Sequence, residues 1–351
     1  MKRLVLFLNF FCLSAYAVTP GETVENFRLE DHKRDSHELY YYRESKAIAF
    51  MVQGNGCPIA RNAAVDYHKL KNQYESKGIK FLMINSNLQD SVKSIRDEAQ
   101  EYEYEIPILK DETQLVGESL LLTRTGEVFL IDTSDWKIIY SGALNDRLTY
   151  ENQKEVATKF FLEDAIKNTL AGKEVEVKQT EALGCLMNFP EQRNLQKHTK
   201  ISYSDEIAPI LISNCVGCHR KGGIGPWAMT DYKMIQGFSP MIREVLRTKR
   251  MPPWHADSEV GHFSNDRSLT EKEFKTLVHW IEAGSPRGKG EDPLAKLQVS
   301  ETKWANEQIF GRPPDYVVNL PKVEIPSSGV IDYKYLTKKN PITEDIWVGG
   351  V

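Results

Sequence analysis

The feature that most constrains this chain is the motif from Cys215 to His219, in which two cysteines three residues apart precede a histidine. Thiols at this spacing lie on one turn of backbone, where both can add to the two vinyl groups of a single haem. The adjacent imidazole then reaches the iron from the same side. A zinc site would need further soft ligands, and residues 201–290 contain no other cysteine. The motif therefore predicts haem c, attached at Cys215 and Cys218, with His219 as the proximal ligand of the haem iron.

The opposite side of such an iron needs a distal ligand, and Met251 is the leading candidate. Pro252 and Pro253 follow it, and two prolines hold a loop that cannot become helical, so the thioether can be fixed in place. Met251 could instead be a core side chain. Other residues of the same region also remain open as ligands: Met229, Met234, Met241, His255 and His262. A methionine ligand predicts a higher haem potential than a second histidine would give.

Residues 1–17 have the pattern of a cleavable signal peptide. Two basic residues precede an apolar run that is too short to cross a bilayer. Ala15 and Ala17 supply the small residues of a cleavage site; the alternative is an uncleaved anchor. We therefore expect a periplasmic or secreted protein, in a compartment that favours disulfides and haem attachment. The net charge of −4 gives no reason to expect nucleic acid as a partner, and no later segment reads as a membrane span.

Residues 18–175 alternate the apolar patterns of strands with those of helices. Predicted strands cover residues 46–53, 79–85, 127–132 and 137–141, and predicted helices cover 59–76, 91–103 and 152–171. Two strand–helix pairs followed by a hairpin and a helix predict a thioredoxin-like α/β domain. Residues 176–200 are charged and show no clear periodicity, so we interpret them as a linker.

Residues 201–290 have the pattern of a small all-α domain. A short helix over residues 204–213 leads into Cys215, and glycine-rich loops follow the histidine. A last helix is predicted over residues 270–283. Thr270 and Glu273 have the spacing of a capping box at its start, while a glycine and a proline end it.

Cys57 is the candidate nucleophile of the α/β domain. It follows a buried strand pattern and precedes a helical one. At the start of a helix, the dipole and the free N–H groups lower the pKa of a thiol and raise its reactivity. The segment from Asn55 to Arg61, together with Ile84 to Asn87, resembles the redoxin family of the thiol-specific antioxidant type. The resemblance covers roughly residues 18–187 and implies a thiol-based oxidoreductase or antioxidant activity.

Three positions depart from the patterns of related families. A thioredoxin would have a second cysteine where this chain has Ala60, and a peroxiredoxin would have a threonine where it has Gly54. The loop that usually places a cis-proline beside the thiol has Gly126 at that position. Because of these departures, neither a dithiol oxidoreductase of the thioredoxin type nor a standard peroxidase follows from the sequence.

Cys185 is the remaining thiol without a predicted role. It could pair with Cys57 in a structural or redox-cycling disulfide, so both cysteines are candidate catalytic residues. Alternatively, the two are separate free thiols and Cys185 is buried as a small apolar side chain. Arg61 and Arg124 could stabilise a thiolate at Cys57, although a surface ion pair is an equal alternative for each.

Several motifs of residues 201–290 resemble a family of bacterial exported cytochrome c-like domains. They are Asn214–Arg220, Gly222–Pro226, Arg250–Asp257 and the closing helix with Trp280–Pro286. In that family the domain often follows a redoxin domain and precedes a copper monooxygenase-like module, which implies a role in electron transfer.

The tail of residues 291–351 shows two alternating patterns typical of strands, at 311–318 and 323–335. They are similar to the lead-in of that copper module, although no His-His or His-x-His copper pair follows them. The tail could be the truncated start of the β module, could pair with a separate copper monooxygenase-like partner, or could be an unstructured extension.

Three functions remain open at this point. The leading one is a periplasmic electron-transfer protein that combines haem c with a thiol-reactive redoxin domain and exchanges electrons with a redox partner protein. The second is an enzyme, a thiol or haem peroxidase. The third is a binding module that docks a copper enzyme.

Overall fold

The structure is a computed structural model. It describes residues 19–148, 153–192, 195–254, 256, 260–298, 306–324 and 334–350. The predicted signal peptide and the candidate ligand His255 lie outside the described residues. Two compact parts make up the described chain, one ending at Lys296 and the other beginning at Leu297.

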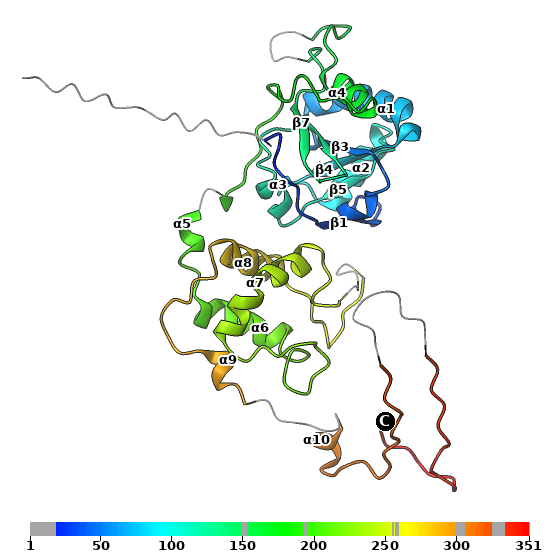
Figure 1. The fold of residues 1–351 in the computed structure, drawn as a ribbon, viewed down its shortest axis with the longest axis vertical. Helices are drawn as coiled ribbons and strands as arrows, with labels where there is room; N and C mark the ends of the chain where they lie inside the picture. Colours follow the sequence, from blue (N-terminus) through cyan, green and yellow to red (C-terminus); the bar gives the residue numbers. More distant parts are fainter. Residues whose placement is uncertain are drawn as a thin grey trace, which may run out of the picture. The chain divides into compact units, whose positions relative to one another are not determined.

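A mixed β-sheet forms the first half of the larger part (Figure 1). Its strands, in the described residues, have the order β2-β1-β5-β4-β3-β6-β7. Their bounds are β1 (Arg28–Asp31), β2 (Ser36–Glu38), β3 (Ala47–Val52), β4 (Ile79–Asn85), β5 (Ile108–Lys110), β6 (Val128–Asp132) and β7 (Ile138–Gly142). The central strand β3 pairs in parallel with β4 and antiparallel with β6. This arrangement confirms the predicted thioredoxin-like α/β fold and adds β1, β2 and β5, whose short runs gave no clear pattern.

The sheet is buried on both faces because β3 sends alternate side chains to two cores. Ala49 and Met51 pack with one cluster, to which α1 and α4 contribute Tyr67 and Ile166. Phe50 belongs to the cluster on the opposite face. The helices of this half are α1 (Pro58–Tyr74), α2 (Val92–Glu101), α3 (Leu115–Ser119) and α4 (Phe161–Leu170), with two short 3-10 turns, η1 (Leu39–Tyr42) and η2 (Glu75–Lys77).

Helix α4 is shorter than predicted. The segment before it, residues 153–160, is not helical. Its backbone is bound instead to the Asp146 carboxylate, which accepts hydrogen bonds from the N–H groups of Thr158 at 2.7 Å and Lys159 at 2.9 Å. A carboxylate that binds successive N–H groups holds them in a loop and leaves the helix to begin later.

The segment interpreted as a linker packs against the sheet domain. The N–H of Ser141 in β7 donates to the carbonyl of Lys178, and Thr180 donates back to the carbonyl of Ser141, each at 3.0 Å. Further along, Met187 donates to the carbonyl of Thr123 at 2.9 Å. Residues 178–187 therefore form a strap that is bound to the sheet domain at both ends.

The described residues from 195 to 298 form helices and loops, with no strand among them. The elements are α5 (Leu195–His198), a π-helical turn η4 (Tyr203–Ile207), α6 (Ala208–Asn214), α7 (Tyr232–Arg247), α8 (Glu271–Glu282) and α9 (Pro293–Lys296). Helix α8 begins with the predicted capping box of Thr270 and Glu273. Helix α7 was not predicted, because Gly237 and Pro240 inside it are residues that usually disfavour helices. Its buried Ile235, Ile242 and Leu246 share one face, and packing of that face outweighs the poor local propensity.

The second compact part contains α10 (Glu307–Phe310). Residues 311–318, predicted as a strand, form no strand in the structure, and their apolar side chains, such as Val317, are exposed. An isolated alternating segment without a partner strand gains no ladder of hydrogen bonds, so the pattern alone does not make a strand. Most of the other predicted strand, residues 325–333, lies outside the described residues. Among the helices that the structure does describe, none has the length and apolar character needed to cross a bilayer.

Candidate functional site

Cys57 lies at the junction of β3 and α1, as the sequence predicted. It is the N-cap residue of α1, and Pro58 begins the helix. Its carbonyl accepts the first helical hydrogen bond, from the N–H of Arg61 at 3.0 Å. The side chain is only 2% exposed. A thiol is thus placed where the N-terminal helix dipole favours its ionised form.

Cys185 lies directly against this thiol. The Cys185 thiol donates a hydrogen bond to the Cys57 sulfur, with 2.9 Å between the two Sγ atoms. Both cysteines are free in this structure, and Cys185 is exposed while Cys57 is buried. The two thiols that the sequence left as either a pair or separate groups are therefore brought together, with the buried one beneath the accessible one.

The strap holds Cys185 in this position through Thr125. The N–H of Thr125 donates to the Cys185 carbonyl, and the N–H of Cys185 donates to the Thr125 hydroxyl, each at 3.0 Å. A side chain at Gly184 would place its Cβ 1.8 Å from the carbonyl oxygen of Thr125. The strap can therefore approach the thiol site this closely only with glycine at position 184.

Thr125 is the site residue that sequence reasoning missed. Its hydroxyl donates a hydrogen bond to the Cys57 sulfur at 2.9 Å. A Cβ at Gly54 would lie 2.5 Å from the Cγ2 methyl of Thr125, so Thr125 fills the space that a side chain at position 54 would need. The hydroxyl expected three residues before the nucleophile is supplied from the loop before β6. The signal available in the sequence was that loop itself, which was noted only for its missing proline.

The two thiols differ in their acidity. Burial alone would raise the pKa of Cys57, but hydrogen bonds from Cys185, from Thr125 and from the N–H of Ala60 outweigh it and lower the pKa below the usual range. Burial, the hydrogen bond to Cys57 and the charge of that thiolate all raise the pKa of Cys185. As the pH rises, Cys57 therefore ionises first, and Cys185 remains the protonated partner that donates to it.

Arg61 forms an ion pair instead of contacting the thiol. Its Nη2 lies 2.8 Å from Oε2 of Glu98, and its guanidinium stacks over the Tyr102 ring at 4.4 Å. The same Glu98 oxygen accepts the N–H of Gly56 at 2.9 Å. Glu98 thus fixes the turn before Cys57, while Arg124 donates to the carbonyl of Gly184 at 3.0 Å and binds the strap.

A second buried carboxylate supports the loop before Cys57. Asp90 Oδ2 accepts the backbone N–H of Asn55 at 3.0 Å and the side-chain amides of Asn85 at 2.8 Å and Asn87 at 3.1 Å. Asn85 ends β4 and Asp90 precedes α2, so the network joins the two loops at the carboxyl ends of the parallel strands β3 and β4. Loops that are held by satisfied buried hydrogen bonds keep the thiol in one position.

The motif from Cys215 to His219 lies on one turn that follows α6. The N–H groups of Cys218 and His219 both donate to the carbonyl of Cys215, at 3.1 and 2.9 Å. Burial, together with the charge of Cys218, raises the pKa of Cys215 to about 12. The described residues therefore place both cysteines and the histidine on one turn, as the motif predicted.

His219 has one ring nitrogen engaged by the protein. Its Nδ1 lies 3.1 Å from the carbonyl oxygen of Trp227, and a Cβ at Gly225 would lie 2.7 Å from the same nitrogen. When Nδ1 carries the proton and donates to this carbonyl, Nε2 keeps its lone pair for a metal. Gly225 thus packs closely on the histidine ring, and the Trp227 carbonyl orients it.

Met251 follows α7 and joins Pro252 through a cis peptide bond. Its side chain is 38% exposed, whereas Met229 is 7% exposed and belongs to the helical core. Met234 and Met241 are partly exposed on α7, and His262 is exposed in the loop before α8. Burial within the core accounts for Met229, whereas Met251, Met234, Met241 and His262 all have accessible side chains, so exposure alone does not select the distal ligand.

Comparison with known proteins identifies the sheet domain. The AhpC/TSA family matches residues 20–140. A conserved protein from Geobacillus kaustophilus is similar at 28% identity over 49% of this chain and 93% of that one, with a TM-score of 0.45. Peroxidoxin BcpB from Mycobacterium tuberculosis is similar at 18% identity over 43% and 94%, with a TM-score of 0.33. PrxQ from Xylella fastidiosa is similar at 15% identity over 45% and 98%, with a TM-score of 0.35.

No curated protein matches the chain. The family match nevertheless agrees with the strand order and with the position of Cys57 at the start of α1. Residues 20–140 are therefore an AhpC/TSA redoxin domain with a thioredoxin-like fold, which is a domain of the oxidoreductase and antioxidant type.

Proposed function

We propose that the protein is an exported, periplasmic redox protein in which Cys57 and Cys185 cycle between two thiols and a disulfide. The observation that supports this most directly is the 2.9 Å contact between the two sulfur atoms. The acidity of the pair assigns the roles, because Cys57 has the lowered pKa of a nucleophile and Cys185 has the raised pKa of a resolving thiol.

A hydroperoxide is the oxidant that suits this site best. The Cys57 thiolate attacks the terminal oxygen, the O–O bond breaks, and the alkoxide leaves with a proton as an alcohol. Cys57 is then a sulfenic acid. The Cys185 sulfur attacks it, hydroxide leaves as water with the Cys185 proton, and the disulfide forms. Two thiols lose two electrons and the peroxide gains them. Because Cys57 is only 2% exposed, we expect small peroxides to react and protein disulfides to be excluded.

Reduction of the disulfide begins on the other sulfur. Cys185 is exposed, so an external thiol from a redox partner protein can attack it and release Cys57. The thiol of lower pKa leaves faster in thiol–disulfide exchange, and Cys57 is that thiol. The exposure of Cys185 and the lowered pKa of Cys57 therefore both favour attack of the external thiol on the Cys185 sulfur.

The test is a single oxidation followed by peptide mapping under non-reducing conditions. One equivalent of hydrogen peroxide should remove two titratable thiols and link the peptides that contain Cys57 and Cys185. The Cys185→Ser variant should lose one thiol only and accumulate a sulfenic acid that dimedone traps. Equal peroxide consumption by wild type and Cys57→Ser would overturn the proposal and would favour a haem peroxidase.

We further propose that the helical half holds haem c, with Cys215 and Cys218 as the attachment points and His219 as the proximal ligand. The fit rests on the donor set on one turn and on the contact from Nδ1 of His219 to Trp227, which leaves Nε2 for iron. A bound haem would supply one-electron redox chemistry. Met251 would hold the distal position, as its accessible side chain allows.

Spectroscopy of the exported protein tests the haem proposal. A pyridine haemochrome should show one haem per chain that resists acid–acetone extraction. The double variant Cys215→Ala/Cys218→Ala should lose it. Met251→Ala should retain the haem and lose the low-spin methionine signature, and Met234→Ala serves as its control. A Met251→Ala protein with an unchanged low-spin spectrum would exclude Met251 as the ligand.

Docking of a copper monooxygenase-like partner is the second candidate. The second compact part exposes large apolar side chains, among them Tyr335 and Trp347, and exposed apolar residues are common where a partner binds. Co-purification of such an enzyme with the full chain, and its loss after removal of residues 297–351, would support this function. Equal recovery with and without the tail would contradict it.

A further inference from the structure

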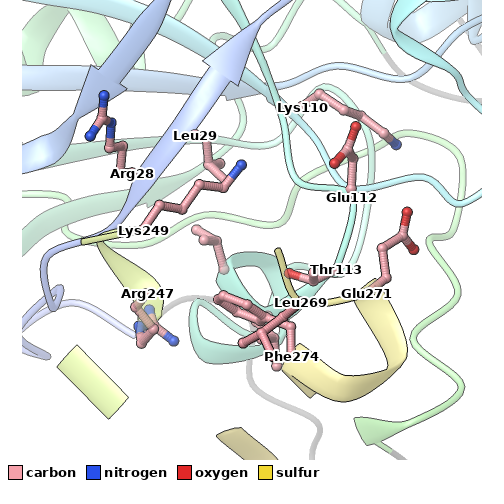
Figure 2. Close-up of a pocket in the computed structure, with 12 residues that line it drawn as sticks. Arg28, Leu29, Lys110, Glu112, Thr113, Arg247, Lys249, Leu269, Glu271 and Phe274 are labelled. Atoms are coloured by element: carbon pink, nitrogen blue, oxygen red, sulfur yellow. The ribbon is translucent and has the colours of Figure 1, made fainter. Parts of the chain in front are cut away.

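A cavity of about 120 Å³ lies between the sheet and the helices of the larger part (Figure 2). Strands β1 and β5 and helix α3 line it from the sheet domain, and the ends of α7 and α8 line it from the helical half. In Figure 2, Arg28, Arg247 and Lys249 lie on one side of it and Glu112 and Glu271 on the other. Lys110 also lines the cavity, so cationic side chains outnumber the carboxylates in a chain whose net charge is −4.

Arg247 is the unusual member of this group. It is only 5% exposed, and its guanidinium makes one hydrogen bond, from Nη2 to the Ser119 hydroxyl at 3.2 Å. Nε and Nη1 are buried without a partner. Leaving buried polar atoms unsatisfied costs about 1–3 kcal/mol, and more for a charged group. The Arg247 guanidinium therefore lies beside the cavity with two N–H donors that lack a hydrogen-bond acceptor.

The neighbouring carboxylates do not accept hydrogen bonds from the unpaired nitrogens of Arg247. Glu25, Glu282 and Asp111 are close enough to act on its charge, but none makes a hydrogen bond with it in the described residues. Glu25 and Glu282 both bind Arg243, at 2.5 and 2.7 Å. Desolvation, followed by repulsion from Arg243, lowers the pKa of Arg247.

Asp111 is likewise already engaged. Its carboxylate accepts hydrogen bonds from the hydroxyl of Ser86 and the N–H of Gly117, each at 2.8 Å. Glu25, Glu282 and Asp111 are thus committed to other donors, while Glu112 and Glu271 line the cavity together with Arg247.

The other cations differ in how fully they are engaged. Nζ of Lys110 donates to the carbonyl of Asn87 at 2.6 Å, and Nε of Arg28 donates to the hydroxyl of Ser36 at 2.6 Å. Lys249, two residues after Arg247, forms no ion pair in the described part of the chain. Arg247 and Lys249 together offer two unpaired N–H groups and a point charge that forms no ion pair in the described residues, which are donors that oxyanions bind.

We propose that this cavity binds a small oxyanion, a phosphate or a carboxylate group, through the unpaired N–H donors of Arg247 with Lys249 as the second cation. The anion would lie between the sheet domain, which contributes Arg28 to the lining, and the helical half, which contributes Arg247. It would therefore act as a bridge that stabilises the two halves against each other, at a site that contains neither cysteine pair.

Thermal unfolding of the full chain tests the site, with sodium phosphate and sodium acetate compared against sodium chloride at matched ionic strength. Wild type should show a saturable rise in Tm with phosphate, acetate or both, and the more effective anion identifies the chemical source. Arg247→Met should remove the saturable rise and increase the Tm in chloride alone, because it removes an unsatisfied buried charge. Arg250→Gln is the matched control, since Arg250 is exposed and pairs with Glu244, and it should respond like wild type.

A second variant, Arg247→Lys, tests the site in case Arg247→Met does not fold. Arg247→Lys keeps the charge and loses the guanidinium N–H donors, so the midpoint of the phosphate titration should rise by at least about tenfold, the effect expected for one lost charge-assisted hydrogen bond. Cys57→Ser should retain the full response, because the site does not involve the thiols. An equal response of wild type and Arg247→Met would overturn the proposal, and so would a wild-type Tm that does not differ between phosphate, acetate and chloride.

Discussion

The two cysteine pairs of this chain are built in opposite ways. Cys57 and Cys185 are separated by 128 positions in the sequence, and the fold brings their sulfur atoms to 2.9 Å. Cys215 and Cys218 are three positions apart and share a single turn. The pKa values of Cys57 and Cys215 are also shifted in opposite directions. Hydrogen bonds outweigh burial and lower the pKa of Cys57, whereas burial raises the pKa of Cys215 to about 12.

This difference indicates two kinds of sulfur chemistry. A lowered pKa prepares a thiolate for repeated attack on a substrate, and it needs hydrogen-bond donors from several loops. The proposed haem attachment would need only the correct spacing, because it would occur once and the sulfurs would then serve as anchors. The sheet domain therefore positions its cysteine pair through tertiary structure, and the helical half positions its pair through local sequence.

The largest expected effect is a reciprocal loss in two cysteine variants. Cys57→Ser should lower peroxide-driven thiol oxidation by at least about 100-fold, because the nucleophile is removed, and should leave the haemochrome unchanged. Cys215→Ala/Cys218→Ala should lose the haemochrome and keep the wild-type rate of peroxide-driven thiol oxidation. Stopped-flow peroxide consumption and pyridine haemochrome spectra measure the two properties on the same samples. Loss of both properties in either variant would show that the centres are not separately built.

The same contrast explains what the sequence could predict. Strand β4 was predicted at residues 79–85, which are its bounds in the structure, because a continuous apolar run identifies a buried strand. Helix α8 was predicted from the side chains of its capping box, which are local. The contact of Cys57 with Cys185 stayed open, since no local pattern encodes a pairing across 128 positions.

Thr125 shows the limit most clearly. The sequence indicated a missing threonine at Gly54, and the structure places the hydroxyl of Thr125 on the same sulfur from another loop. Helix α7 was missed for a different reason, because Gly237 and Pro240 gave a local signal against helix that packing of its apolar face outweighs. Residues that act through tertiary contacts are therefore the ones that sequence patterns do not identify.

Gly184→Ala is expected to disrupt the contact between Cys57 and Cys185 and to leave Cys215 and Cys218 in place. Its Cβ would lie 1.8 Å from the Thr125 carbonyl oxygen, so the strap must move and carry Cys185 away from Cys57. A displacement of about 1 Å can slow a reaction by about 100-fold, and we expect disulfide formation after oxidation to slow by that order. Gly237→Ala is the control, because no atom lies within 4 Å of its added Cβ. Similar rates in Gly184→Ala and wild type would contradict the role assigned to the strap.

Thr125→Val tests which hydrogen bond prepares the thiolate. The variant keeps the shape of the side chain and loses the donor to Cys57, so the pKa of Cys57 should rise. A hydrogen bond to a charged group contributes about 1.5–3 kcal/mol, and we expect the rate of peroxide reduction at neutral pH to fall by about tenfold. The rate depends on the thiolate, so the inflection of the pH profile should move to higher pH and the two proteins should converge in alkali.

Thr125→Ser is the matched control for this variant. It retains the hydroxyl that donates to Cys57 and accepts from the N–H of Cys185, so its pH profile should follow that of wild type. A profile of Thr125→Val that falls in amplitude without moving along the pH axis would show that the residue positions the strap and does not stabilise the thiolate.

The smallest expected effect concerns the helical half alone. Thr270 caps α8 by accepting the N–H of Glu273, whose carboxylate binds the N–H and hydroxyl of Thr270 in return. Thr270→Ala should lower the free energy of unfolding by about 1 kcal/mol, measured by denaturant titration with circular dichroism as the probe. Thr276→Ala, within the same helix and bound only to the Lys272 carbonyl, should change it by less than about 0.5 kcal/mol. Neither variant should alter the oxidation of Cys57, because the thiol site depends on loops of the sheet domain and on the strap. A thiol rate that falls in Thr270→Ala but not in Thr276→Ala would show instead that the stability of α8 reaches the redoxin domain.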